Sequence, residues 1–126
     1  MRKFIMPLIM IFFLVSCSKE TPTPVTVTIY GKWNILKYQE ISNGVVDYNY
    51  IGKPNDYLEF KLNKSYTIYV DSSIIESGMF EINGSILCFD STDIWDVSTL
   101  TSSEAIIERS TIKPSSSERF IFYLKR

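Results

Sequence analysis

The feature that most restricts the fold of this chain is a two-residue alternation of apolar and polar side chains, repeated in short runs. Between Tyr57 and Leu62, for example, every second residue is aliphatic or phenyl. Successive side chains of a β-strand point to opposite faces, so this period predicts half-buried strands and not helices. The predicted strands lie at residues 31–41, 57–62, 66–70, 78–82, 87–89, 95–101, 104–112 and 118–125.

Turn residues separate these runs at intervals of about eight to twelve residues. Asn83-Gly84 is the residue pair that a type I′ hairpin turn favours, and Asn43-Gly44 is a second signal of this kind. The polar segment 113–117 predicts the last loop. The sequence therefore predicts an all-β domain of eight or nine short antiparallel strands, either closed as an up-and-down barrel or stacked as a sandwich.

The first predicted strand lacks a clean alternation. Trp33 and Ile35 share one face, whereas Leu36 and Tyr38 share the other. One extra residue in a strand shifts all later side chains to the opposite face. We therefore expect a β-bulge in this strand.

Composition excludes several kinds of chemistry. The chain has no histidine, which removes Ser-His-Asp and Cys-His nucleophile activation and the common histidine zinc sites. Two cysteines are too few for a thiolate zinc site, and the charges include no cluster of Lys or Arg that would suit nucleic acid. We expect no enzyme activity, no cofactor, no metal site and no nucleic-acid partner.

Carboxylates are the remaining candidates for catalysis, and most of them fall on the outward face of a predicted strand or in a turn. The segment Asp90–Asp96 contains three acids spaced by three residues, but it lacks the alternating oxygen ligands and the Gly of an EF-hand loop. We interpret this segment as a hydrated hairpin tip rather than a calcium site.

The N-terminus has the three parts of a secretory signal. Arg2 and Lys3 are positive, residues 4–15 are an apolar run, and Ser16 supplies a small residue before a cut. As a helix this run rises only about 18 Å, against a bilayer core of about 30 Å. We expect residues 1–16 to be a signal peptide. Residues 17–30 then form a tether, with prolines that favour extended chain.

Leu14-Val15-Ser16-Cys17 resembles the bacterial lipobox at all four positions. The resemblance implies cleavage before Cys17 and attachment of a diacylglycerol to its sulfur. Two or more acyl chains anchor a protein stably in a membrane. An acidic residue directly after the cysteine is a membrane-sorting signal that this chain lacks, so we expect a cell-envelope lipoprotein in the outer membrane.

Gly31-Lys32-Trp33 at the start of the first strand is similar to the Gly-x-Trp signature of lipocalins and their calycin relatives. Small lipocalin-like lipoproteins of Bacteroidetes-type bacteria are more similar still. They share the order of four motifs, which here are Gly31–Trp33, Tyr57–Phe60, Gly78–Ile82 and Leu100–Ser103. The resemblance covers residues 31–126 and implies a small lipocalin-like barrel.

In lipocalins the tryptophan of this signature closes the bottom of the barrel, and a basic residue packs across it. Trp33 matches this tryptophan, and either Lys125 or Arg126 matches the basic residue. The chain departs from full-size lipocalins because it has no helix after the barrel and its loops are short. Both departures count against a large cavity.

The resemblance implies a barrel that binds a small apolar ligand. Phe60, Tyr66 and Phe80 are predicted to form the walls of the site, with Phe89 and Phe122 as further candidates. The alternative is a barrel filled by its own side chains, since eight strands enclose just enough space for them. Such a barrel would act as a protein- or glycan-interaction module, for which exposed loop tyrosines such as Tyr48 and Tyr50 are suited.

Overall fold

A computed structural model describes residues 27–126, which form nine β-strands. The signal peptide, Cys17 and most of the tether lie outside the described residues. Within the described part, no helix is long and apolar enough to span a bilayer. The strands are β1 (Gly31–Ser42), β2 (Val45–Ile51), β3 (Tyr57–Phe60), β4 (Ser65–Val70), β5 (Ser73–Asn83), β6 (Ile86–Phe89), β7 (Asp93–Leu100), β8 (Glu104–Lys113) and β9 (Ser116–Lys125).

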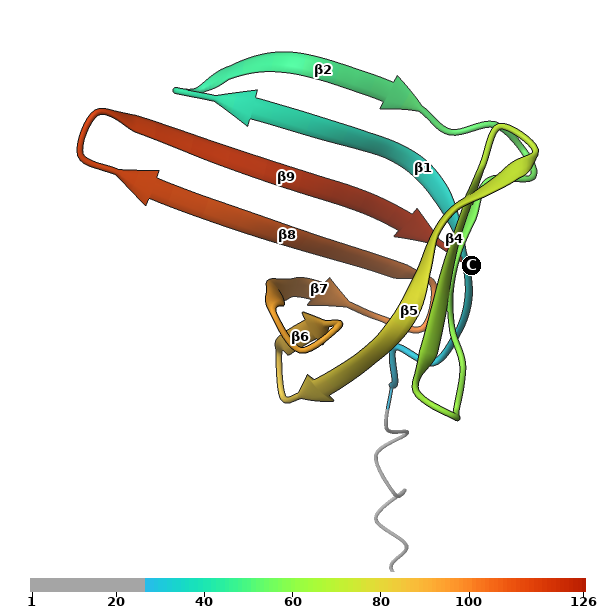
Figure 1. The fold of residues 1–126 in the computed structure, drawn as a ribbon. Coiled ribbons are helices and arrows are strands. Elements are labelled where there is room, and N and C mark those ends of the chain that lie inside the picture. The colour runs from blue at the N-terminus through green and yellow to red at the C-terminus, as the bar shows by residue number, and fades with distance from the viewer. Residues whose placement is uncertain (1–26) are drawn as a thin grey trace, which may run out of the picture.

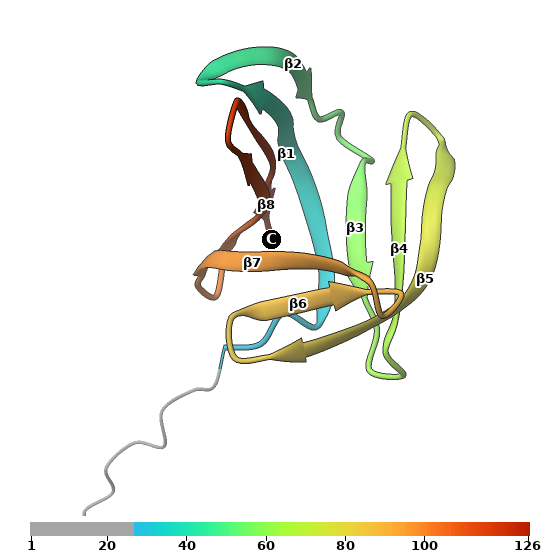
Figure 2. The same ribbon diagram turned by 60° about the vertical axis from the view of Figure 1, so that its left-hand side comes forward.

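The strands form one antiparallel sheet that closes on itself. From β3 to β9 each strand pairs with the next along the chain, and β1 pairs with both β3 and β9. This gives a closed barrel of eight strands, with β2 added along the upper part of β1 (Figures 1 and 2). The predicted all-β, up-and-down, lipocalin-like barrel is confirmed.

Strand β1 organises the barrel because it has different neighbours along its length. Residues 31–34 pair with β3, whereas residues 37–42 pair with β2 on the same edge. The register with β9 shifts between Ile35 and Lys37, which confirms the expected bulge and leaves Leu36 half exposed. After the bulge, Tyr38 and Glu40 face the interior on the same side as Trp33.

Two hairpin turns follow the sequence signals, with one difference. Asn43 and Gly44 have φ of 50° and 82°, as a type I′ turn requires. In the β5–β6 hairpin, however, Asn83 pairs with Ile86, so the turn residues are Gly84 and Ser85. Here only Gly84 has positive φ, which fits a type II′ turn with Gly first. The predicted hairpin is correct, but its turn is displaced by one residue.

One end of the barrel is closed by packed side chains. Trp33 is fully buried, and its indole N–H donates to the carbonyl of Ile29 over 2.8 Å. The guanidinium of Arg126 covers the Trp33 ring at 3.9 Å from the ring centroid. Of the two basic residues that the resemblance allowed, the structure therefore selects Arg126. Ile29 is itself part of the buried core, so the packed domain begins slightly before residue 31.

Candidate functional site

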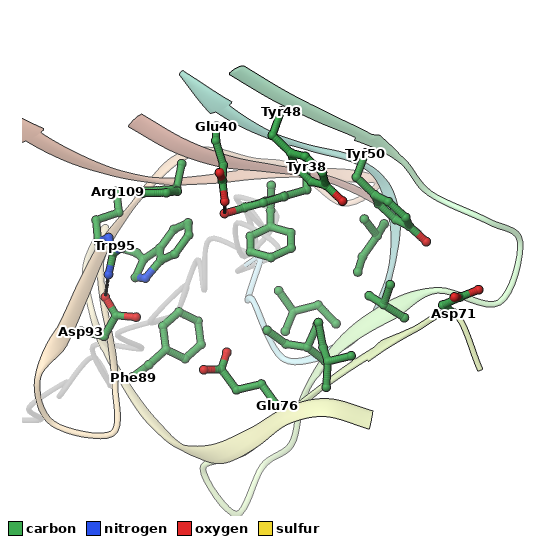
Figure 3. A pocket seen from close by; sticks show the side chains of 17 residues that line it. Tyr38, Glu40, Tyr48, Tyr50, Asp71, Glu76, Phe89, Asp93, Trp95 and Arg109 are labelled. Atoms are coloured by element: carbon green, nitrogen blue, oxygen red, sulfur yellow. Dashed lines mark hydrogen bonds and ion pairs between the residues drawn. The ribbon is translucent and has the colours of Figure 1, made fainter. Parts of the chain in front are cut away.

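The opposite end of the barrel contains a cavity of about 730 Å³ that opens to solvent (Figure 3). Its deeper wall is apolar, and its rim carries tyrosines and charged side chains. The size lies within the range of about 300–1,000 Å³ that is typical of small-molecule sites. The deeper wall includes Ile35, Leu58, Ile68, Phe89 and Trp95.

The three predicted wall residues do not line this cavity. Phe60, Tyr66 and Phe80 are each about 1% exposed and pack in the closed half of the barrel. The Phe60 and Phe80 rings contact edge to face with centroids 4.9 Å apart. These side chains do point inward, as the alternation predicts. Alternation identifies the inward face of a strand, but it does not tell how far along the barrel axis a residue lies.

The other two aromatic candidates do lie at the cavity. Phe89 and Phe122 line it, and Trp95 lies between them, with ring centroids 6.1 Å from Phe89 and 5.7 Å from Phe122. Tyr38 continues this aromatic surface, 4.7 Å from Phe122. The barrel is thus filled in one half and hollow in the other. The sequence analysis considered a ligand-binding barrel and a barrel filled by its own side chains, and each describes only one half.

Tyr48 and Tyr50 also belong to the site. The sequence suggested that both lie on a loop, but they lie on β2, and both line the cavity. The signal that would have located them is the Asn43-Gly44 turn, because a two-residue hairpin forces the next segment to pair with β1. The loop assignment is therefore corrected: β2 raises one wall of the mouth.

Asp56 holds the segment that follows β2. This buried carboxylate accepts hydrogen bonds from the backbone N–H of Lys53 (2.8 Å), the backbone N–H of Asp71 (3.0 Å) and the hydroxyl of Tyr50. Burial alone would raise the pKa of Asp56, but these hydrogen bonds outweigh it and hold the pKa below its usual value. The hydrogen bond between the Tyr50 hydroxyl and Asp56 raises the pKa of Tyr50 to about 12.

Gly52 lets this segment lie against β1. Its N–H donates to the carbonyl of Leu36 over 2.8 Å. A Cβ at this position would lie 1.7 Å from the carbonyl oxygen of Ile35, so no side chain fits. Gly52 and Asp56 together fix the path of the chain from β2 to β3, and with it the position of Tyr50 at the rim.

Charged groups at the rim come from five strands or turns. Arg109 on β8 pairs with Asp93 at 2.6 Å, and its guanidinium lies 4.7 Å from the Phe120 ring centroid. The carboxylate of Glu40 on β1 accepts a hydrogen bond of 2.9 Å from the hydroxyl of Tyr38. Burial and this hydrogen bond both raise the pKa of Tyr38, so it stays neutral at ordinary pH. Asp71 and Glu76 complete the set.

Glu76 differs from the other rim acids. It reaches into the mouth from β5, opposite Glu40 (Figure 3). Among residues 27–126 its carboxylate has no hydrogen-bond or ion-pair partner. Partial burial, together with the negative charges of Asp93 and Asp90, raises its pKa above the usual value. Most acids were expected on the outward faces of strands or in turns; Glu40, Glu76 and Asp93 are exceptions that line the cavity.

The Asp90–Asp96 segment begins with the exposed hairpin turn between β6 and β7, as expected, and continues into β7. The Asp90 carboxylate accepts hydrogen bonds from the backbone N–H of Met79 (2.9 Å) and from the hydroxyl of Tyr66 (3.0 Å). A Cβ on Gly78 would lie 2.2 Å from this carboxylate. Asp90 therefore joins β5, β4 and the β6–β7 turn. No group of three or more metal-ligand side chains occurs within the described range 27–126.

Two donors in the cavity wall remain unsatisfied by the protein. The indole N–H of Trp95 and the Nε–H of Arg109 are buried and have no acceptor among the described residues. Most buried donors in folded proteins are paired, so each of these two N–H groups calls for an acceptor such as a water molecule or a ligand atom. Both side chains lie on the same side of the mouth (Figure 3).

Comparisons of the chain with protein-family models, with curated proteins and with solved structures found no significant match, so the barrel and its cavity are the basis for a functional assignment.

Proposed function

We propose that this protein is a membrane-anchored lipoprotein whose barrel binds one small, mainly apolar molecule in its open end, and that it is not an enzyme. The observation that carries the proposal is the cavity of about 730 Å³ with its apolar floor. A ligand in such a site would bury most of its surface, and each Å² of apolar area removed from water contributes about 25 cal/mol.

The composition of the cavity supports an amphiphilic ligand. The floor is aliphatic and aromatic, whereas the rim carries the hydroxyls of Tyr48 and Tyr50 and the charged groups described above. Apolar walls with a few polar groups at fixed positions are typical of small-molecule sites. The floor would hold the ligand's body, and the rim would hold its head group.

The N-terminal segment joins the barrel at its closed end, and this position supports entry of the ligand into the cavity from the aqueous side. Residues Thr28 and Tyr30 are held at the closed end, where Arg126 donates to both carbonyls. The proposed anchor, Cys17, precedes this end. In an anchored protein the membrane attachment would therefore lie at the closed end and the mouth at the other. The ligand would enter from the aqueous phase of the cell envelope.

A blocking variant tests the proposal. Val70 faces the cavity from β4, whereas Thr67 lies on the outer face of the same strand. The full chain, reconstituted in nanodiscs of zwitterionic lipid, would be titrated with 6-phenylhexan-1-ol by calorimetry, with empty nanodiscs as the blank. Binding should be lost in Val70→Trp and kept in Thr67→Trp. Equal binding by the two variants would place the probe outside the cavity.

A second candidate is a protein- or glycan-interaction module, and one observation favours it. Apolar side chains are exposed along β2 and at the start of β5, two strands that also supply residues of the cavity wall. Clusters of exposed apolar side chains mark interaction surfaces more often than scattered ones do. They are Val45, Val46, Ile51, Ile74 and Ile75. A partner on this surface should still bind the Val70→Trp variant, which separates the two candidates.

A further inference from the structure

The charges at the mouth of the cavity do not cancel. Arg109 is neutralised by Asp93, and Asp71 is paired with Lys53 at 2.5 Å. Glu40 and Glu76 then remain, and within residues 27–126 neither has a cationic partner. The two carboxylates project from opposite sides of the mouth, from β1 and β5 (Figure 3). The rim therefore carries an uncompensated negative charge.

Arg109, the one cation among the lining residues, is poorly placed to bind an anion. Its Nη1 donates to Asp93 over 2.6 Å, and its guanidinium lies against the rings of Phe120 and Trp95. A carboxylate or phosphate on a ligand would have to share Arg109 with Asp93, which occupies Nη1 and leaves the Nε–H unpaired. It would also approach Glu40 and Glu76, and like charges at close range repel each other.

We propose that the cavity selects an amphiphile with a single ammonium group, whose apolar body fills the floor and whose cation lies between Glu76 and Glu40. This inference rests on the proposed ligand-binding function and specifies its ligand class. Glu76 is the main recognition group, because Glu40 already accepts the hydroxyl of Tyr38. Fatty acids and other anionic amphiphiles are disfavoured ligands.

The aromatic side chains beside these carboxylates suit the same head group. Tyr38, Tyr48, Phe89 and Trp95 line the cavity, and Tyr38 and Tyr48 contact edge to face with centroids 6.2 Å apart. An ammonium group is attracted to the face of an aromatic ring, most strongly where water is displaced. The combination of aromatic faces and unpaired carboxylates favours an organic cation over both an inorganic cation and an anion.

The surroundings of Glu76 explain why a cation would be bound there. Asp93 faces it from the start of β7 and Asp90 from the β6–β7 turn. Tyr66 lies on the neighbouring strand β4, and Glu40 and Arg109 lie across the mouth. Burial and the two aspartates disfavour the charged form of Glu76, which is why its pKa is raised. A ligand cation would supply the missing opposite charge. Binding should therefore strengthen as pH rises through the pKa of Glu76.

The test compares three probes that differ only in head group: 6-phenylhexylamine, 6-phenylhexan-1-ol and 6-phenylhexanoate. Each would be titrated into the full chain in zwitterionic nanodiscs near neutral pH, for the natural sequence, Glu76→Gln and Glu81→Gln. Glu81 is the matched control, since it lies on the outer face of the same strand. The amine should bind most tightly and the carboxylate most weakly. Glu76→Gln should weaken the amine about fivefold, which corresponds to one partly exposed ion pair, and leave the alcohol unchanged.

The outcomes distinguish this inference from the proposed function. Equal affinities for all three probes, tightest binding of the carboxylate, or an amine affinity that Glu76→Gln leaves unchanged would overturn the ammonium selectivity, while the binding function would stand. If Glu81→Gln weakened the amine as much as Glu76→Gln, the effect would come from overall charge, and the inference would fail. If none of the probes bound, both the inference and the binding function would be overturned.

Discussion

The guanidinium of Arg126, the last residue of the chain, covers the indole of Trp33 near the start of the first strand, 3.9 Å from the ring centroid. The same guanidinium donates to the backbone carbonyls of Thr28, Tyr30 and Ser102. One side chain thus ties the beginning of the domain to its end and to the β7–β8 turn. The barrel is closed at this end by a contact between residues that are far apart in sequence.

Arg126→Ala should destabilise the domain by about 1–2 kcal/mol, since it removes a cation–π contact and several exposed hydrogen bonds. Lys125→Ala is the matched control, because Lys125 is exposed and its side chain makes no ion pair within residues 27–126. Chemical denaturation followed by tryptophan fluorescence measures both. Equal losses in the two variants would show that Arg126 does not close the barrel in this way.

Asp56 predicts a specific dependence of stability on acid. Because hydrogen bonds hold its folded-state pKa below the unfolded value of about 3.9, its contribution is complete above that value. It is lost as pH falls through the lower folded-state pKa. Asp56→Asn should lower the free energy of unfolding by about 2 kcal/mol at pH 7 and reduce the further loss in acid. Denaturation curves between pH 2 and 7 give both quantities; parallel pH profiles would contradict the role assigned to this carboxylate.

Gly52→Ala should be among the most damaging single substitutions in the β2–β3 segment. The new Cβ would overlap the Ile35 carbonyl, so the segment must move away from β1 and lose the Gly52–Leu36 hydrogen bond. A cost of about 3 kcal/mol is expected for a clash with the backbone. Gly44→Ala is the comparison, because nothing lies within 4 Å of its Cβ and only its φ of 82° opposes a side chain. Thermal melts should show the larger loss for Gly52→Ala.

The sequence predicted the architecture well because alternation and turn residues are local signals. The bulge near Leu36 was expected because Trp33 and Ile35 share one face of the strand whereas Leu36 and Tyr38 share the other. The structure confirms it, with the register shift between Ile35 and Lys37. Even the contact across Trp33 was expected from the family resemblance, except for the choice between Lys125 and Arg126.

The site was less predictable, because whether an inward-facing residue lines the cavity depends on its position along the barrel axis. Phe80 and Phe89 both face inward and pair with each other across β5 and β6, yet Phe89 borders the cavity and Phe80 is packed below it. Such differences are set by strand tilt and by the stagger of the whole sheet, which no local pattern reports. The inward direction of Glu40 likewise depends on the bulge that precedes it in β1.

The proposed lipid anchor predicts the mass of the native N-terminus. Protein isolated from membranes should begin at Cys17 and carry acyl chains, because the lipobox-like sequence precedes that residue. Cys17→Ala should remain unlipidated and leave the membrane fraction. Mass spectrometry of the N-terminal peptide, together with fractionation, provides the measurement. An unmodified N-terminus at Met1 in the membrane fraction would contradict the anchor.

The half-filled barrel predicts that two phenylalanine truncations have different effects. Phe80 is about 1% exposed and contacts Phe60 and Tyr30, so Phe80→Ala would leave a void in the closed half and cost about 3–5 kcal/mol. Phe122 lies at the cavity and is only partly buried. Phe122→Ala would enlarge a space that is already hollow, so its cost should be clearly smaller.

Ligand affinity should follow the opposite order. Phe122→Ala removes a wall that the ligand would contact and should weaken 6-phenylhexan-1-ol severalfold, whereas Phe80→Ala should bind it almost normally at temperatures where the variant remains folded. Thermal melts and calorimetric titration of both variants measure the two effects separately. If Phe80→Ala lost binding at modest cost in stability while Phe122→Ala kept it, the ligand would occupy the closed half of the barrel, and the assignment of the open cavity as the binding site would be wrong.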